Sequence, residues 1–327
     1  MFLKILLVFS FFYFELIVKA DEPPSWVALS NALESIDKAP LAVFGLRDDG
    51  GRSMDCLEVI QLNETIFGLY HARRDGVFSV HLARSEDLRT WTHVTRLDDH
   101  ASQASAVALG QAGILVAYEK DAPNSCWLRL RSYPDLDAWV AGDHEKEFDV
   151  PRTLAPTAEG TPSIERVDWD SGSAIPNRID LRFHYFRQVR VDRAAYGSLT
   201  MWKDWSSKPL SRVNGAFEDL GIRGNLGDRT RFRWGNTLYY LQEAQNFRGD
   251  WRSWGIYLCD ESGIPLKRLN IRTPKGSMAF ANASASWIVD SARGRRLVVT
   301  LFLPGEGAQP GESGSALYAI DLPDPVE

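Results

Sequence analysis

Short β-strand patterns recur along most of the chain, and this recurrence limits the possible folds more than any other feature of the sequence. In the first unit, four strand-like stretches are separated by turn-forming residues. The turns are Asn63-Glu64, Asp75-Gly76 and Ser85-Glu86-Asp87, and the stretches are residues 56–62, 65–73, 77–84 and 90–96. Four consecutive antiparallel strands make a sheet of propeller-blade size. Helix-period patterns are short throughout, which disfavours α/β barrels and doubly wound sheets.

One segment of the first unit is repeated in the second. Residues 84–91, which run from Arg84 to Trp91 through Asp87, resemble residues 131–139, which end on Trp139 and are longer by one residue. Further strand patterns begin near positions equivalent to the first start, and the equivalent starts are Asp55, Gln103, Gly160, Asp228 and Asn282. These starts divide the chain into five units of about fifty residues, within the range of propeller repeats.

The repeat therefore predicts an all-β fold, a five-bladed β-propeller of four-stranded antiparallel blades, formed by residues 21–327 as a single domain. Two strand-like stretches remain at the ends, residues 41–46 and 316–322, and either one could complete a blade and close the ring. A pair of β-sandwiches is the structural alternative. It is disfavoured because the repeat continues over nearly the whole chain.

The first twenty residues have the pattern of a secretory signal peptide. Lys4 precedes an apolar run, and the stretch ends on Val18-Lys19-Ala20, with modest or small side chains where a signal peptidase reads. Glu15 interrupts the run, whose length falls short of the roughly 20 residues that span a bilayer. We expect a secreted protein, and the sequons at Asn63 and Asn282 would make it a glycoprotein in a eukaryotic secretory pathway.

The charge pattern excludes several classes of partner. The net charge is −6, with both signs interspersed, whereas nucleic acids and anionic membranes require concentrated basic surface. The segment Arg190-Val191-Asp192-Arg193 is interpreted as a solvated turn. Three cysteines allow at most one internal disulfide and lack metal-site spacing. We expect a monomer with no bound metal or cofactor, and the sequence leaves open a structural ion at the centre.

Residues 82–91, preceded by the strand-like stretch 66–70, carry a family resemblance. They resemble the blade signature of five-bladed furanosidase-type propellers, which include glycoside hydrolase families 43 and 32 and the mannoside phosphorylases. In that signature an aspartate caps the turn and a tryptophan packs between blades, which assigns structural roles to Asp87, Trp91 and Trp139. The resemblance covers roughly residues 40–322 as architecture.

The resemblance also implies catalytic positions. It places Asp55 in the role of the first-blade acid and Glu159, in Glu159-Gly160, in the role of the general acid. Three departures are visible: Asp55 precedes Cys56 rather than proline, Gln103 stands where an orienting aspartate is expected, and Glu159 lies one residue upstream of the aligned start. These departures leave room for altered chemistry.

The fourth repeat adds polar residues in an otherwise apolar context. Asp228 and Arg229 enter one strand and Glu243 lies on its neighbour. Because burying a carboxylate or amide without a partner costs about 1 to 3 kcal/mol, these groups either pair with one another or bind a ligand. We regard Arg229, Glu243, Gln103 and Trp234 as candidate substrate-binding residues, with Arg229 suited to a substrate carboxylate or a pair of hydroxyls.

The functional hypothesis is a glycoside hydrolase that acts on an oligo- or polysaccharide. Cleavage requires one carboxylic acid to protonate the leaving oxygen and one carboxylate to activate water or attack the sugar. Glu159 is predicted as the acid, Asp55 as the base and Asp228 as the group that orients the acid or holds hydroxyls. A noncatalytic propeller that binds glycans or proteins is the alternative, and a polysaccharide lyase with a histidine or tyrosine base also remains open.

Overall fold

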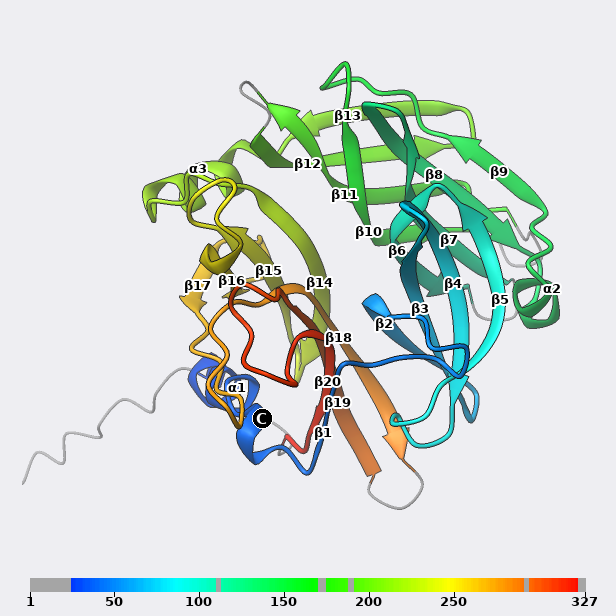
Figure 1. The fold of residues 1–327 in the computed structure, drawn as a ribbon. Coiled ribbons are helices and arrows are strands. Elements are labelled where there is room, and N and C mark those ends of the chain that lie inside the picture. Colours follow the sequence, from blue (N-terminus) through cyan, green and yellow to red (C-terminus); the bar gives the residue numbers. More distant parts are fainter. Residues whose placement is uncertain (1–24, 110–112, 170–174, 188–190, 291–293, 323–327) are drawn as a thin grey trace, which may run out of the picture.

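The computed structural model describes residues 25–109, 113–169, 175–187, 191–290 and 294–322. They form five four-stranded antiparallel sheets around a common axis, and Figure 1 shows β2, β6, β10, β14 and β18 as the innermost strands of the ring. The predicted five-bladed β-propeller is confirmed. The proposed signal peptide, residues 1–20, lies outside the described residues. No helix in the described part of the chain is long and apolar enough to cross a membrane.

The first three blades follow the chain in order. Blade 1 contains β2 (Asp55–Leu62), β3 (Thr65–Arg74), β4 (Val77–Ser85) and β5 (Thr92–Asp99). Blade 2 contains β6 (Ala101–Ala108), β7 (Ile114–Ala122), β8 (Ser125–Tyr133) and β9 (Lys146–Asp149). Blade 3 contains β10 (Glu159–Asp168), β11 (Arg178–Arg187), β12 (Val191–Thr200) and β13 (Asp204–Pro209).

The last two blades close the ring. Blade 4 contains β14 (Leu226–Trp234), β15 (Thr237–Gln245), β16 (Trp254–Cys259) and β17 (Pro265–Arg268). Blade 5 contains β18 (Ala281–Asp290), β19 (Gly294–Leu303), β20 (Gly314–Ile320) and β1 (Leu41–Phe44). Both terminal stretches therefore join the same blade, because β1 pairs with β20 and supplies its outer strand. The ring is closed by hydrogen bonds between the two ends of the chain.

Short helices lie outside the sheets. Among the described residues these include α1 (Ser25–Leu33), α2 (Leu136–Ala141), α3 (Ser211–Asp219) and the 3₁₀ turns η1 (Ile36–Lys38) and η4 (Trp251–Ser253). Helix α2 occupies the second copy of the repeated segment, where Asp135 caps its N-terminus by accepting a hydrogen bond from the backbone N–H of Ala138. In the first copy Asp87 instead accepts from the backbone N–H groups of Arg89 and Thr90 and closes a turn.

The apolar core is divided among the blade interfaces. One hydrophobic cluster lies between each pair of neighbouring blades. Trp91 packs between blades 5 and 1, and Trp139 packs between blades 1 and 2, where its ring lies 5.3 Å from that of Phe67. Both indoles are buried, at 2% and 0% exposure, in agreement with the structural role predicted for them. Stability thus comes from the interfaces and leaves polar side chains free to surround the axis. All three cysteines are free thiols, so no disulfide adds to it.

Candidate functional site

Each inner strand carries a bulge close to its start. The ladder between the first and second strands shifts register in all five blades, and the shifts lie at Asp55/Glu58, Ser102/Ser105, Gly160/Ser163, Leu226/Arg229 and Ala281/Ser284. In four blades the first bulge residue has a positive φ, between 47° and 52°: Cys56, Gln103, Thr161 and Asn282. Such values are uncommon for residues other than glycine, and bulges re-aim side chains near functional sites. In blades 1 and 3 the residues equivalent to Gln103 are therefore Cys56 and Thr161. Each lies one residue after the predicted strand start, Asp55 or Gly160.

Side chains from the second strands hold these bulges in place. Nδ1 of His71 on β3 accepts from the backbone N–H of Gln103 at 3.2 Å, and Oε2 of Glu119 on β7 accepts from that of Thr161 at 3.0 Å. Glu243 on β15 accepts in the same way from Asn282 at 2.5 Å. In each case a polar group of one blade reaches the inner strand of the next, so the blades fix titratable groups beside the axis.

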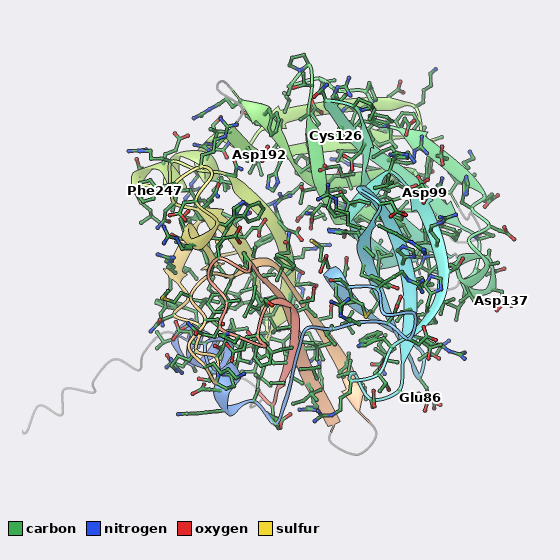
Figure 2. All side chains as sticks on the ribbon, in the orientation of Figure 1. Glu86, Asp99, Cys126, Asp137, Asp192 and Phe247 are labelled. Carbon is green, nitrogen blue, oxygen red and sulfur yellow. The ribbon has the colours of Figure 1, made fainter. Side chains whose placement is uncertain are left out.

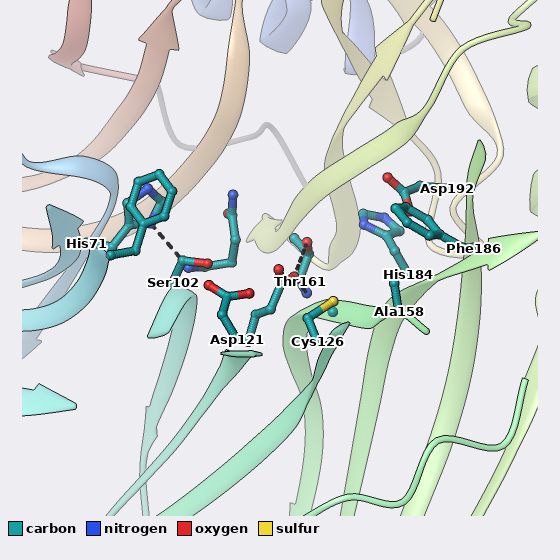
Figure 3. A pocket seen from close by; sticks show the side chains of 13 residues that line it. His71, Ser102, Asp121, Cys126, Ala158, Thr161, His184, Phe186 and Asp192 are labelled. Carbon is teal, nitrogen blue, oxygen red and sulfur yellow. Dashed lines mark hydrogen bonds between the residues drawn. The ribbon is translucent and has the colours of Figure 1, made fainter. Parts of the chain in front are cut away.

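A cavity of about 330 Å³ opens where blades 1, 2 and 3 meet. Its lining includes the carboxylates of Glu119, Asp121 and Asp192. In Figure 3 Asp121 and Cys126 lie together on blade 2, and His184, Phe186 and Asp192 project from blade 3. Figure 2 shows Cys126 and Asp192 toward the inside of the ring, whereas Glu86 and Asp137 lie at its outer edge.

Burial changes the acidity of the cavity carboxylates. It raises the pKa of Glu119 to about 7, and the charges of Asp121 and Asp192 contribute to the rise. It also raises the pKa of Asp192 to about 7 and shifts the pKa of Asp121 upward. Desolvation and like charges both favour the protonated form. Near neutral pH the cavity therefore contains protonated and ionised carboxyl groups together.

Two histidines also line the cavity, and both are neutral at physiological pH. Burial lowers the pKa of His71 to about 4, and burial together with the Arg229 guanidinium lowers the pKa of His184 well below its usual range. Because Nδ1 of His71 accepts a hydrogen bond, the proton of the neutral ring resides on Nε2. His71 is therefore a hydrogen-bond donor at the cavity wall.

One group of side chains in the cavity is close enough to hold a cation. The ligand atoms of Glu119, Asp121 and Cys126 lie within 4.8 Å of one another. Two carboxylates suit a hard cation such as Ca²⁺ or Mg²⁺, whereas a thiolate suits a softer one. Burial and the nearby carboxylates raise the pKa of the Cys126 thiol far above its usual range, so the thiol is protonated.

A second group of carboxylates contains two of the residues predicted from the fourth repeat, Asp228 and Glu243, together with Glu58. Glu243 accepts hydrogen bonds from the backbone N–H groups of Asp228 and Asn282, and burial raises its pKa to about 8. Burial raises the pKa of Asp228 to about 6 and that of Glu58 to about 8, and Asp228 acts on both glutamates by like charge. Arg229, whose pKa burial lowers to about 10, lies beside this group.

The other predicted residues occupy several different environments. Gln103 lines the cavity and accepts a hydrogen bond from Nδ2 of Asn282 at 3.3 Å. Asp55 accepts hydrogen bonds from the hydroxyls of Ser53 and Ser315 and is not among the lining residues. Trp234 is buried in the core between blades 4 and 5, a placement that favours packing over substrate contact.

The structure places Glu159 and Gly160 in two different environments. The side chain of Glu159 is buried, and its Oε1 accepts from the backbone N–H groups of Thr153, Leu154 and Ala155. Glu159 thereby holds the segment before β10 and does not line the cavity, while Gly160 does. A Cβ at Gly160 would collide with Oε2 of Glu119, so the glycine leaves room for a carboxylate from blade 2. The catalytic role of Glu159 remains a prediction.

Sequence reasoning missed Glu119, Asp121 and Asp192. The interpretation of residues 190–193 as a solvated turn was wrong for Val191 to Arg193, because β12 begins at Val191 and Asp192 lines the cavity. A usable signal was present. In the second strands of blades 1, 2 and 3, an aromatic residue is followed directly by a titratable one. The pairs are Tyr70-His71, Tyr118-Glu119 and Phe183-His184. The recurrence marks one face of these strands as functional.

The raised carboxyl pKa values predict that the protein loses stability between pH 6.5 and 8.5. Glu58 and Glu243 have pKa values of about 8 in the folded state, above about 4.3 in the unfolded chain, so the native state binds more protons in this range. Stability present at low pH is lost as pH rises through the folded values, by on the order of 1 kcal/mol per group. The lowered pKa values of the histidines affect stability only below about pH 6.5.

Thermal unfolding measured between pH 6.5 and 8.5 should show a melting temperature that falls as the pH rises, and Glu243→Gln should make this fall smaller. A melting temperature that rises over the same range would contradict the assignment.

Solved structures share this architecture. A glycoside hydrolase superposes with a TM-score of 0.61 at 11% identity, over 94% of this chain and 100% of its own. A protein solved as an RGII complex gives 0.60 at 10% identity, over 87% and 92%. A thermostable family-43 glycoside hydrolase gives 0.54 at 10% identity, over 85% and 92%. At such identities the likeness establishes the fold alone, a five-bladed β-propeller.

No family model matches the chain, and no curated protein matches it by sequence.

Proposed function

We propose that the protein is a glycoside hydrolase whose substrate binds in the cavity between blades 1, 2 and 3. The observation that supports this most is the presence of carboxylates from neighbouring blades in one cavity, Glu119 on blade 2 and Asp192 on blade 3, both with the pKa raised to about 7. Carboxyl groups that differ in protonation state are what glycosidic-bond cleavage requires. Structural neighbours that are glycoside hydrolases support the same reaction class.

Glu119 is the better candidate for the general acid. Asp121 lies beside it, and two carboxylates so close together share a proton because both cannot ionise freely. The backbone N–H of Thr161 fixes the orientation of Glu119 through its Oε2. Glu119 donates its proton to the leaving glycosidic oxygen, and Asp192 activates water or attacks the sugar. His71 donates an Nε2–H hydrogen bond to a sugar hydroxyl.

The direct test is hydrolysis of a panel of aryl glycosides and polysaccharides by the purified protein. Release of a phenol or a reducing sugar from at least one member would support the proposal. Glycan binding without any product would instead favour the noncatalytic propeller, and an unsaturated product would indicate a lyase.

We also propose that the protein is secreted, and its two sequons give a test of accessibility. Asn63 lies in the exposed turn between β2 and β3, with Glu64 and Thr65 also exposed. Asn282 is half-buried in the bulge of β18 and donates its amide to Gln103. On expression through a eukaryotic secretory pathway, Asn63→Gln should abolish the mobility shift that a peptide N-glycosidase removes, while Asn282→Gln should retain it. A shift that persists in Asn63→Gln would place the glycan elsewhere.

A further inference from the structure

The described lining of the cavity between blades 1, 2 and 3 is acidic and has no basic side chain that is charged at neutral pH. It contributes Glu119, Asp121 and Asp192 but neither lysine nor arginine. Its histidines, His71 and His184, are neutral. A ligand that enters the cavity therefore meets several carboxyl groups and no cationic side chain on the wall.

Arginines that interact with lining residues are not themselves part of the described lining. Arg229, which the sequence suggested as a partner for a substrate carboxylate, contacts His184 through Nη2 and donates to Gln242 through Nε. It is 3% exposed and is not a lining residue. Because His184 lines the cavity and contacts the guanidinium, an anion in the cavity meets the neutral imidazole first.

The same holds near Asp192. Arg193 is 4% exposed and donates to Glu218 and to the backbone oxygens of Asp192 and Gly224, so its charge is already paired. Arg248 lies close enough to lower the pKa of Asp192, but it is not part of the described lining.

We propose that the cavity accepts a sugar ring without an anionic group and rejects uronate and sulfated sugars, an inference that rests on the proposed hydrolase function. An anionic substituent would lose water and meet like-charged carboxylates on the wall of a partly buried site, with no lysine or arginine on that wall to pair with it. A neutral sugar ring finds suitable partners. Carboxylate oxygens accept hydrogen bonds from its hydroxyls, the Nε2–H of His71 donates a hydrogen bond to one hydroxyl, and the amide of Gln103 can donate and accept. Phe78 and Phe186 add apolar surface to the same wall.

The test compares matched pairs of nitrophenyl glycosides that differ only at C6, such as glucoside with glucuronide and galactoside with galacturonide. In EDTA we expect kcat/KM of the neutral member to exceed that of the uronide by roughly tenfold or more, since like-charge contacts are strongly unfavourable. At pH 8, where Glu119 is also ionised, Asp121→Asn removes one charge without removing either proposed catalytic group, and it should bring the ratio of the two kcat/KM values closer to one. Asp137→Asn, at an exposed site outside the cavity, should leave the ratio unchanged.

The outcomes separate this inference from the function on which it rests. Equal or better cleavage of the uronides, in EDTA or with millimolar Ca²⁺ added, would overturn the selectivity and leave the hydrolase assignment standing. A ratio that Asp121→Asn does not change at pH 8 would also overturn it, because the cavity charge would then not be its cause. If no glycoside of either kind is bound or cleaved, the proposed function fails first and the inference falls with it.

Discussion

Replacing Glu119 by glutamine should lower the rate of glycosidic-bond cleavage by roughly 10²- to 10⁴-fold, the usual contribution of a general acid. Glutamine keeps the size of the side chain and an oxygen that can accept from Thr161, but it has no acidic proton for the leaving group. The loss should therefore appear in kcat, and it should be smaller for substrates whose leaving group needs no protonation. Initial rates on aryl glycosides with good and poor leaving groups measure this directly.

Asp192→Asn should cause a loss of similar size that does not depend on the leaving group, because the base or nucleophile acts on the sugar carbon or on water. Matched controls exist at exposed sites on the outer edge of the ring: Glu86→Gln for the glutamate and Asp137→Asn for the aspartate. Both should retain wild-type rates.

Glu159→Gln decides between the two candidate acids. Its carboxylate is held by backbone N–H groups away from the cavity lining, so we expect the variant to keep its activity and to lose some stability. If Glu159→Gln lost activity by orders of magnitude while Glu119→Gln retained it, the role of general acid would return to Glu159, as the family resemblance suggested.

The propeller fold could be predicted from the sequence because its evidence is local and repeated. Strand patterns, turn residues and the copied segment each recur, and blades 1 to 4 need only pairing between consecutive strands. The way in which the ring of blades is closed was harder to predict. Nothing in residues 41–46 or 316–322 alone shows that β1 pairs with β20, since that pairing joins the two ends of the chain.

The site was harder to predict because a bulge changes which side chain faces the axis. A one-residue offset in a strand moves a side chain to the opposite face. Glu159 and Gly160 show the effect of such an offset, because neighbouring residues of β10 face opposite sides: the glycine lines the cavity, while the glutamate turns to the segment that precedes the strand. The carboxylates that reach the cavity come from β7 and β12, whose approach to the axis depends on the packing between blades.

The second large prediction concerns Gly160. Gly160→Ala should lower the rate of glycosidic-bond cleavage about as much as Glu119→Gln does, by roughly 10²-fold or more. The backbone of Gly160 does not have a positive φ, so alanine is compatible with its conformation. The added Cβ would collide with Oε2 of Glu119, and the flexible glutamate is the group that can move. The carboxyl group would then leave the position that the N–H of Thr161 fixes.

Gly160→Ala is informative because it changes no titratable residue. Gly215→Ala is its matched control: a Cβ there meets no atom within 4 Å, and alanine in helix α3 should add about 0.5 to 1 kcal/mol of stability without affecting turnover. Since both changes act through one carboxyl group, the double variant Gly160→Ala/Glu119→Gln should be no slower than Glu119→Gln alone. Full activity in Gly160→Ala, or additive losses in the double variant, would show that the glycine does not act by making room for Glu119 and would remove the structural reason for placing the acid there.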